Sequence, residues 1–193
     1  QFPEHKYPQL RFFLGDIRDF QRLKYAFEGI DIVVHAAALK QVPAAEYNPM
    51  ECVKTNIDGT NNVIIAAIQN KVEKVLAIST DKAVNPINLY GSTKLAADKL
   101  MIAANNLSGN AKTIFSIVRY GNIISSEGSV IPKFKQMIAD GNKVLPLTHK
   151  EMTRFLMNLN DAIHFVLFSL INMKGGEILI PKLPSVRIVD IIK

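Results

Sequence analysis

The sequence predicts an α/β fold, a Rossmann-like doubly wound parallel sheet with a smaller C-terminal substrate-binding region. Two observations support this prediction. Short β-branched, apolar runs alternate with helix-length segments through residues 10–119, and such alternation favours right-handed crossovers and a parallel sheet. After Asn122, glycine and proline separate shorter elements, which is typical of a region that covers a sheet without repeating it.

The expected elements follow one another along the chain. Residues 10–14 form a short apolar run that ends at Gly15-Asp16, so a strand is expected there. Residues 30–35 are almost continuously apolar and β-branched, which is typical of a strand buried on both faces of a parallel sheet. By the same criteria, strands are expected at residues 74–80 and 113–119, and helices at residues 20–27, 58–69 and 92–105.

Small and polar residues follow the expected strands. The carboxyl ends of parallel strands meet at one edge of a sheet, and ligands of doubly wound sheets bind at that edge. The segments expected there are Gly15-Asp16, Ala36-Ala37-Ala38, Ser79-Thr80-Asp81-Lys82 and Tyr120-Gly121-Asn122.

The net charge and hydropathy of the chain indicate which class of ligand it binds and whether it contacts a membrane. The net charge of +6 attracts anions. Lysine and arginine are scattered, with no basic run and no interleaved aromatic stripe, which favours phosphorylated small molecules over nucleic acid. The longest apolar stretch, residues 162–171, is too short to cross a bilayer and predicts a buried helix. No membrane contact is therefore expected.

Cysteine and histidine usage points to a reduced, metal-free protein. Cys52 is the single cysteine, which suits a cytoplasmic location, and a small helix residue is the preferred interpretation over a reactive thiol. His35, His149 and His164 lack the spacing of metal ligands, so no metal is expected.

Tyr90 and Lys94 are the first candidates for chemistry. Four residues apart at the start of a helix, they project from one face. The ammonium would lower the pKa of the phenol, so that the tyrosine can accept a hydroxyl proton as hydride leaves the adjoining carbon. Taken alone, the spacing fits an exposed helix pair at least as well.

Asp81 and Lys82 stand nine and eight residues before Tyr90, at the expected end of a strand. A carboxylic acid beside an amine can carry out proton transfers that a plain dehydrogenase does not need. The alternative is a capping turn in which Asp81 accepts backbone N–H bonds and Lys82 is solvated.

Motifs over nearly the whole chain resemble the extended short-chain dehydrogenase/reductases in order and spacing. They are Gly15-Asp16-Ile17-Arg18-Asp19, His35 to Ala38, Asn56-Ile57-Asp58-Gly59-Thr60, Tyr90 to Lys94 and Arg119 to Asn122. Within that family, Ser79-Thr80-Asp81-Lys82-Ala83-Val84-Asn85-Pro86 is similar to the signature of UDP-N-acetylglucosamine 4,6-dehydratases, whereas related hexose dehydratases carry Thr-Asp-Glu. Tyr90 favours the inverting type, because membrane-bound and multifunctional relatives tend to carry Met there.

The resemblance implies a dehydration by internal hydride transfer. Tyr90 would take the hydroxyl proton at carbon 4, with Lys94 holding the nicotinamide ribose and Thr80 bonding the 4-oxygen. Lys82 would remove the carbon 5 proton and Asp81 would protonate the leaving hydroxyl at carbon 6. Reprotonation of carbon 5 from the opposite face gives inversion. This chemistry needs Lys82 at least partly neutral and Asp81 protonated.

The resemblance also implies binding residues for NADP, which is expected in preference to NAD, and for UDP-N-acetylglucosamine. The expected cofactor contacts are Asp16, Ile17, Ala36, Ala37, Ala38, Ile78, Ser79, Tyr90, Lys94 and Tyr120. The expected substrate contacts are Lys40, Asn122, Arg154 and the turn Glu127, Gly128, Ser129, Val130 and Ile131. Relatives often carry Arg where Glu127 stands, and a surface ion pair is the alternative for Arg154.

The Gly-x-Gly-x-x-Gly turn of a Rossmann sheet does not occur in the sequence. We therefore expect residues 1–122 to form an NADP-binding core whose first βαβ unit lies upstream, and residues 123–193 to form part of the substrate-binding region. The isolated 193-residue chain is expected to be inactive, because the glycine turn should supply most pyrophosphate contacts.

Two other functions are compatible with these residues. A UDP-sugar 4-epimerase, or another extended short-chain dehydrogenase, would need Tyr90 and Lys94 but not Asp81 and Lys82. A non-catalytic NADP-binding module would bind ligand without turnover. In each case a homo-oligomer, dimer or hexamer, is expected from the resemblance.

Overall fold

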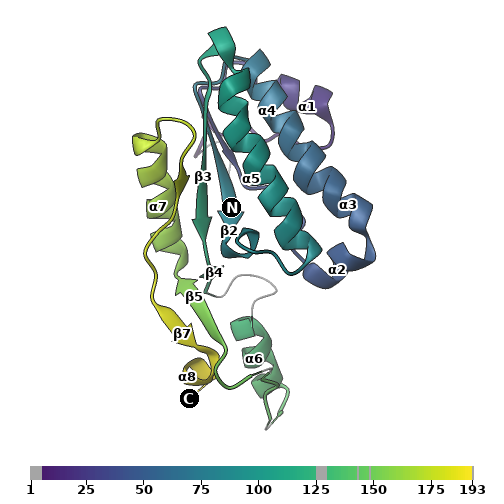
Figure 1. Ribbon diagram of the computed structural model, residues 1–193, viewed down its shortest axis with the longest axis vertical. Helices are drawn as coiled ribbons and strands as arrows, with labels where there is room; N and C mark the ends of the chain where they lie inside the picture. The colour runs from purple at the N-terminus through teal and green to yellow at the C-terminus, as the bar shows by residue number, and fades with distance from the viewer. Residues whose placement is uncertain (1–5, 125–129, 143, 148, 193) are drawn as a thin grey trace.

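The computed structural model describes residues 6–124, 130–142, 144–147 and 149–192. Its centre is a parallel sheet in the order β1-β2-β3-β6. The strands are β1 (Ile32–His35), β2 (Lys74–Thr80), β3 (Ile114–Tyr120) and β6 (Ile178–Leu179). Helices α4 (Gly59–Gln69) and α5 (Leu89–Leu107) cover one face, with α1 (Phe20–Ala26) beside α4, and α7 (Leu159–Asn172) lies on the other face (Figure 1). The predicted Rossmann-like α/β fold is confirmed.

A smaller sheet follows the core strands. It has the order β4-β5-β7, formed by β4 (Asn122–Ile123), β5 (Thr153–Met157) and β7 (Ser185–Arg187), with β7 antiparallel to β5. Two helices accompany this sheet, α6 (Val130–Ala139) and α8 (Ile188–Ile192). Between β5 and β7 the chain returns to the larger sheet, where α7 packs against β2 and β3 and β6 pairs with β3. The division at residue 122 remains a prediction.

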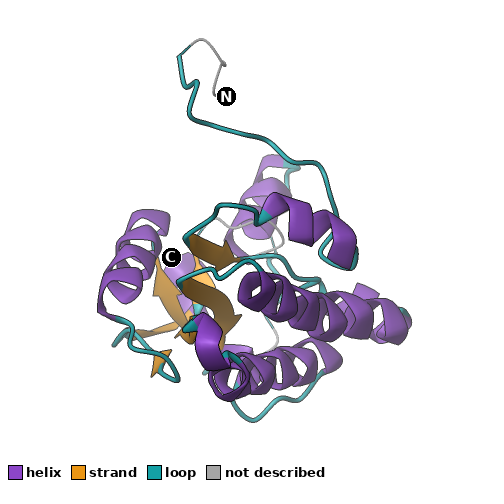
Figure 2. Ribbon diagram, turned by 90° about the horizontal axis from the view of Figure 1, so that it is seen from above, coloured by secondary structure: helices purple, strands orange, loops and turns teal. Residues whose placement is uncertain are grey.

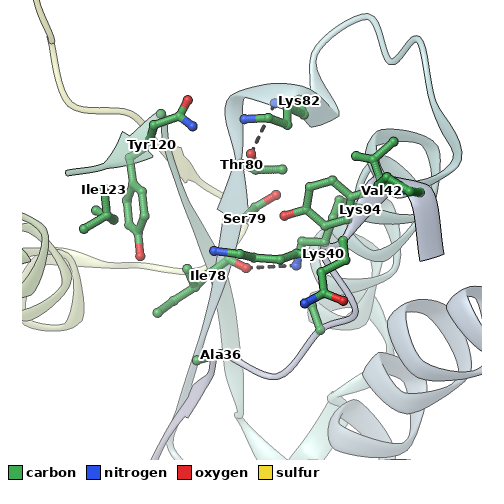
Figure 3. A pocket seen from close by; sticks show the side chains of 16 residues that line it. Ala36, Lys40, Val42, Ile78, Ser79, Thr80, Lys82, Lys94, Tyr120 and Ile123 are labelled. Carbon is green, nitrogen blue, oxygen red and sulfur yellow. Dashed lines mark hydrogen bonds between the residues drawn. The ribbon is translucent and has the colours of Figure 1, made fainter. Parts of the chain in front are cut away.

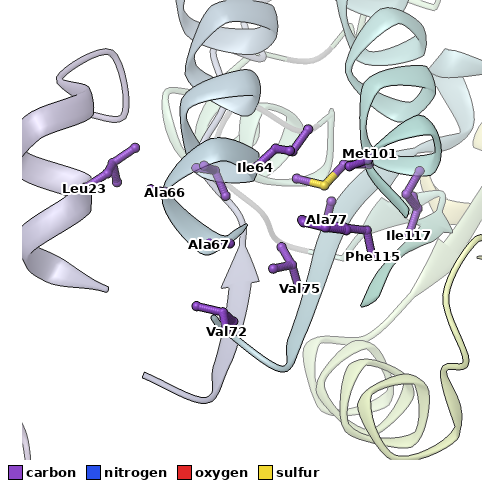
Figure 4. Close-up of a cluster of buried hydrophobic side chains, with 12 residues drawn as sticks. Leu23, Ile64, Ala66, Ala67, Val72, Val75, Ala77, Met101, Phe115 and Ile117 are labelled. Atoms are coloured by element: carbon purple, nitrogen blue, oxygen red, sulfur yellow. The ribbon is translucent and has the colours of Figure 1, made fainter. Parts of the chain in front are cut away.

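The hydrophobic core lies on both faces of the larger sheet. Val75 and Ala77 of β2 face α4 and α5, where they join the cluster in Figure 4. Leu76 points the other way, toward Met173 and the apolar side of α7. All three β2 residues are at most 4% exposed, as expected for a strand whose alternate side chains both meet covering helices.

Side-chain caps define where α5 and α7 begin. Asn88 accepts the Gly91 N–H at 2.9 Å, so α5 begins at Leu89, three residues before the expected start. Asn158 caps α7 in the same way by accepting the Asp161 N–H at 2.8 Å. The early start of α5 includes Tyr90 in the first helical turn, which fixes its direction relative to Lys94.

The expected strand at residues 10–14 is not formed. Residues 9–16 run as a loop, and the segment before α1 stands away from the body of the molecule (Figure 2). Phe12 and Leu14 are 78% and 93% exposed, and Ile32 at the edge of the sheet is 50% exposed. A strand exists only through ladder hydrogen bonds, and no described strand lies beside this segment.

The apolar stretch at residues 162–171 forms most of α7 but is not fully buried. Ala162 and Ser169 face inward, whereas Phe168 and Ile171 are 56% and 76% exposed. The expectation of a buried helix was therefore wrong for one side of α7. None of the helices that the structure describes is both long enough and apolar enough to pass through a bilayer.

Three further elements surround the amino end of α5. They are α2 (Val42–Tyr47), α3 (Pro49–Val53) and a π-helical turn, Lys54–Asp58, that leads directly into α4. Short 3-10 turns at Asp81–Ala83 and Gly109–Ala111 follow β2 and α5. All of these except the last lie near the carboxyl ends of β1 and β2.

Glu177 fastens the α7–β6 connection to β3. Its carboxylate accepts hydrogen bonds from the Ser116 hydroxyl at 2.6 Å and from the backbone N–H groups of Lys174 and Gly175 at 2.8 Å each. Burial alone would raise the pKa of Glu177, but these donors outweigh it and the pKa lies below its usual 4.5.

We expect Glu177→Gln to lower the free energy of unfolding at pH 7 by about 1.5–3 kcal/mol, the usual worth of hydrogen bonds to a charged group. Because the folded-state pKa is depressed, this stabilisation is present above pH 4.5 and is lost as pH falls further. Denaturant unfolding at several pH values should show the difference from wild type shrinking in acid. A difference independent of pH, or an equal loss in the exposed control Glu28→Gln, would contradict this.

Candidate active site

A cavity of about 520 Å³ opens at the carboxyl ends of the core strands (Figure 3). Thr80 and Ile78 come from β2, Lys94 projects from α5, and Tyr120 and Ile123 stand on the opposite side. The residues that the sequence predicted and that line this cavity are Ala36, Ala38, Lys40, Ile78, Ser79, Thr80, Lys82, Tyr90, Lys94, Tyr120 and Asn122. The structure thus gathers the expected segments at one edge.

Several expected site residues are not brought to this cavity, among them Asp81, which lines a neighbouring pocket. Asp16 is exposed and forms an ion pair with Arg18 at 2.7 Å. Ile17 packs beneath α4, where a Cβ on Gly59 would lie only 2.6 Å from its Cδ1. Ala37 does not line the cavity although both its neighbours do.

The expected substrate turn is only partly described. Glu127, Gly128 and Ser129 lie outside the described residues, and Val130 and Ile131 form the first turn of α6. Arg154 does not line the cavity; its guanidinium donates to the carbonyl of Thr153 at 2.7 Å.

Lys94 is buried at the base of the cavity, with 5% of the residue exposed. Its Nζ donates to the carbonyl of Ile78 at 2.9 Å (Figure 3). Burial lowers the pKa of Lys94, and the negative charge of Asp98 opposes this effect. The ammonium therefore has one backbone partner and further protons available for a ligand.

Tyr90 is 9% exposed beside Lys94. Burial raises the pKa of Tyr90, and a hydrogen bond with Thr80 opposes the rise. The expectation that Lys94 lowers this pKa is not met in the described arrangement, because Lys94 Nζ is directed at the carbonyl of Ile78. Formation of a phenolate here requires positive charge closer to the phenol.

Asp81 and Lys82 form an ion pair immediately after β2. Lys82 Nζ lies 3.1 Å from Asp81 Oδ1, and the two side chains are 37% and 30% exposed respectively. Thr80 Oγ1 donates to the same carboxylate at 3.0 Å and accepts the Lys82 backbone N–H at 3.3 Å. The expected neutral amine and protonated acid differ from this ion pair by the position of one proton.

Gly91 allows α5 to approach the loop that carries this ion pair. A Cβ at position 91 would clash with the carbonyl oxygen of Lys82 and would lie 2.9 Å from Pro86 Cβ. The distance between the Asp81–Lys82 segment and Tyr90 is therefore set by the absence of a side chain.

Asn56 belongs to a motif that carries the family resemblance, but the sequence assigned it no role, and it supports the cavity without lining it. It is 1% exposed within the π-helical turn. Its amide exchanges two hydrogen bonds with the backbone of Leu39, at 2.8 and 2.9 Å, and donates to Thr93 Oγ1 at 3.0 Å. Asn56 thereby fixes the loop after β1 relative to α5. A π-turn inside a helix is a frequent mark of a functional site.

His35 is a buried structural residue. Thr60 Oγ1 donates its single proton to the carbonyl of Asn56 at 2.7 Å, so it must accept from His35 Nε2 at 3.1 Å. Burial, together with the charge of Lys94, lowers the pKa of His35 to about 4. The ring is therefore neutral at pH 7. Within the part of the chain that the structure describes, no three His, Cys, Asp or Glu side chains are grouped so that they could hold a metal.

Comparison with known proteins identifies relatives of this chain by sequence. Residues 2–193 match the family described as polysaccharide biosynthesis protein. A UDP-N-acetylglucosamine 4,6-dehydratase (inverting) of Campylobacter jejuni is 57% identical over 94% of this chain and 54% of its own length. An uncharacterized membrane protein of Methanocaldococcus jannaschii is 54% identical over 96% and 55%. A UDP-glucose 4-epimerase of Rickettsia conorii is 47% identical over 92% and 52%.

Solved structures share the fold. Pen from Bacillus thuringiensis superposes with a TM-score of 0.91 and 42% identity, covering 98% of this chain and 60% of that one. A dTDP-glucose 4,6-dehydratase double mutant from Streptomyces venezuelae, with NAD bound, gives a TM-score of 0.87 at 24% identity, covering 98% and 63%. The chain spans about half the length of the curated relatives it matches.

Proposed function

This chain belongs to the polysaccharide biosynthesis protein family, and from that premise we propose that the protein is a nucleotide-sugar 4,6-dehydratase. It converts UDP-N-acetylglucosamine to a UDP-4-keto-6-deoxy-hexosamine with inversion at carbon 5. The observation that carries the proposal is the meeting, at one cavity, of the Tyr90–Lys94 pair with Thr80 and Lys82, whose amine is ion-paired with Asp81 just outside the lining. The 57% identity to the inverting dehydratase supports the same substrate and stereochemistry.

The cavity has room and donors for a nicotinamide cofactor. Ala36 and Ala38 present no bulk where β1 ends, and Lys94 has ammonium protons to spare beyond its bond to Ile78. A bound nicotinamide cofactor supplies the hydride acceptor for carbon 4 and the hydride donor for carbon 6. The preference for NADP over NAD, and the adenine contacts of Asp16 and Ile17, rest on the resemblance.

The first half of the reaction uses Tyr90, Lys94 and Thr80. Tyr90 accepts the carbon 4 hydroxyl proton, and Lys94 holds the cofactor ribose from its fixed place beside Ile78. Burial raises the pKa of Tyr90. Positive charge that lies close to the phenol once the ligands are bound lowers this pKa again and so favours the phenolate. Thr80 then turns its hydroxyl proton from Asp81 to the 4-oxygen of the sugar.

The second half uses the Asp81–Lys82 ion pair. Transfer of one proton across the 3.1 Å contact turns the ion pair into a carboxylic acid and an amine. Exclusion of water by bound substrate favours this neutral form, because it removes two charges from a low-dielectric site. Lys82 then removes the carbon 5 proton, made acidic by the 4-ketone, and Asp81 gives its proton to the hydroxyl leaving carbon 6.

Substrate binding is proposed to use one face of the cavity. Asn122 Oδ1 is buried without a hydrogen-bond partner, so a donor from the ligand is needed there. Lys40, an exposed cation on the lining, fits the diphosphate. Arg154 and the turn at residues 127–131 remain candidate contacts from the resemblance alone.

A 4-epimerase is the second candidate, favoured by the 47% identity to a rickettsial UDP-glucose 4-epimerase. Both reactions begin with oxidation at carbon 4, and only the dehydratase needs proton exchange at carbon 5.

NMR of the full-length protein with NADP and UDP-N-acetylglucosamine in heavy water separates the two candidates. A dehydratase gives a 4-keto-6-deoxy product with deuterium at carbon 5 and no net change in the cofactor. Return of a 4-hydroxyl sugar with protium at carbon 5 would refute dehydration and support the epimerase.

We expect Gly91→Ala to reduce turnover by about tenfold, because misplacement of reacting groups by about 1 Å can cost up to a hundredfold. The added methyl would push the Lys82 carbonyl away from α5 and separate the two catalytic pairs. Steady-state rates should be compared with those of Ser92→Ala, at the neighbouring exposed position. Equal rates for Gly91→Ala and wild type would show that this close approach does not position the site.

We also propose a cytoplasmic homo-oligomer. Cys52 is a buried free thiol, in keeping with a reducing compartment, and UDP-sugars are charged ligands that call for an aqueous site. The oligomer rests on the resemblance, and sedimentation of the full-length protein as a monomer would refute it.

A further inference from the structure

A buried carboxylate beneath the cavity connects three elements of the site. Asp98 of α5 is 2% exposed. Its Oδ2 accepts the Ser79 hydroxyl at 2.9 Å and the Arg119 Nε at 2.8 Å, and lies 2.7 Å from Arg119 Nη2. Ser79 and Arg119 are register partners on β2 and β3. Asp98 therefore joins α5 to the carboxyl ends of both strands.

The connected positions adjoin both catalytic pairs. Thr80 follows Ser79 directly and leads into the Asp81–Lys82 turn. Lys94 lies four residues before Asp98 on the same side of α5. A shift of α5 against β2 would change the distance between the two pairs, and the bond from Asp98 to Ser79 opposes that shift.

Asp98 also acts on the charges of the site. Burial lowers the pKa of Lys94, and Asp98 is the acidic group that opposes it. Burial likewise raises the pKa of Tyr90, and the charge of Asp98 adds to that rise. Arg119, whose side chain is 13% exposed, pairs with this carboxylate and keeps the buried charge balanced.

The other titratable groups around Lys94 and Tyr90 come from several elements. His35 of β1 is neutral at pH 7. Cys52 of α3 and Asp81 of the turn after β2 both add to the rise in the pKa of Tyr90. Lys82 and Tyr120 line the same cavity. Asp98 differs from these groups because it acts on both members of the Tyr90–Lys94 pair.

We propose that Asp98 is a positioning residue of the reaction assigned above, so the inference rests on that function. Through Ser79 and Arg119 it holds the Tyr90–Lys94 pair in one arrangement with the Thr80–Lys82 segment. Its carboxylate is also the fixed negative charge that keeps Lys94 an ammonium able to hold the cofactor. Asp98 itself touches neither substrate nor cofactor.

The test uses Asp98→Asn and Asp98→Glu in the full-length protein, with Asp31→Asn as a matched loss of one carboxylate at the opposite end of β1. The titration of Lys94 Nζ is followed by NMR of labelled lysine, assigned with Lys94→Met. The rate of reduced-nicotinamide formation is measured across pH in single turnovers. Asp98→Asn removes the carboxylate charge, so Lys94 should titrate at lower pH. The pH dependence of the rate should shift in the same direction.

We expect about a tenfold loss of rate in both Asp98 variants, since both disturb the positioning. Asp98→Glu should keep the Lys94 titration near its wild-type position, because the charge remains. An unchanged Lys94 titration in Asp98→Asn, or an equal shift in Asp31→Asn, would overturn the proposal. A wild-type protein that forms no reduced nicotinamide from UDP-N-acetylglucosamine would refute the proposed function, while the Lys94 titration would still decide the role of Asp98.

Discussion

Tyr90→Phe is expected to abolish the first half of the reaction. The variant lacks the phenol oxygen that is proposed to take the carbon 4 hydroxyl proton, so reduced nicotinamide should not form. The expected loss is about a hundredfold to ten-thousandfold, the usual worth of a positioned general base. Single-turnover absorbance of the full-length protein measures it directly.

The fold should survive this change. The substitution removes one oxygen from a residue that is 9% exposed and leaves its ring in place, so the melting temperature is expected to change little. Tyr25→Phe is the matched control, because Tyr25 lies on α1 and is 67% exposed. Normal formation of reduced nicotinamide by Tyr90→Phe would assign the base to another group, with Thr80 or a bound water next in line.

The rate of this step should depend on pH in a defined direction. Burial raises the pKa of Tyr90, with a smaller opposing effect of the Thr80 hydrogen bond. The phenolate fraction therefore grows as pH increases, and the wild-type rate of the first step should grow with it. In Tyr90→Phe this limb of the profile should be absent.

A continuous apolar run predicted β2 well, but β1, which was expected to be buried on both faces, lies at the edge of the sheet with Ile32 and Val34 50% and 42% exposed. The strand expected at residues 74–80 matches β2, Lys74–Thr80. The cavity residues that follow β2 were predicted for the same reason, because the end of a parallel strand marks the ligand edge. Residues 10–14 carry a similar apolar pattern, but a strand also needs a neighbour, and the pattern of one segment does not reveal it.

The polar contacts inside the site were much harder to predict. Asn56 bonds Leu39, 17 residues away, and Asp98 bonds Arg119, 21 residues away. Such contacts have no periodic signal in a sequence. A usable sign was present at Asp98, which occupies the same helical face as the buried residues Lys94 and Met101. A charged residue on an apolar helix face calls for a buried partner.

The ionisation states of the catalytic pairs could not be predicted from the sequence either. The spacing of Tyr90 and Lys94 indicated one helix face, but not that Lys94 Nζ would reach the carbonyl of Ile78. Likewise the order Asp81-Lys82 did not reveal an ion pair at 3.1 Å. Both depend on side-chain rotamers and on burial, which follow from tertiary packing.

Lys82→Ala is expected to stop the reaction after the first hydride transfer. Tyr90, Lys94 and Thr80 remain, so the 4-ketone and reduced nicotinamide should form and persist. Loss of the base should halt removal of the carbon 5 proton, with turnover reduced about a hundredfold to ten-thousandfold. Absorbance of reduced nicotinamide and deuterium content at carbon 5, both measured in heavy water, report the two steps separately.

Asp81→Asn provides the companion variant, because it removes the acid and leaves the amine. It should prevent loss of the carbon 6 hydroxyl and also slow carbon 5 exchange, because Lys82 loses the carboxylate that takes up its proton. Lys99→Ala, on the exposed side of α5, controls for the loss of one positive charge and should turn over normally. Near-normal turnover by Lys82→Ala, with deuterium still entering carbon 5, would exclude Lys82 as the base. A bound water, or Tyr90 once it has released the carbon 4 proton, would then be the next candidate, since Tyr90 shares the cavity.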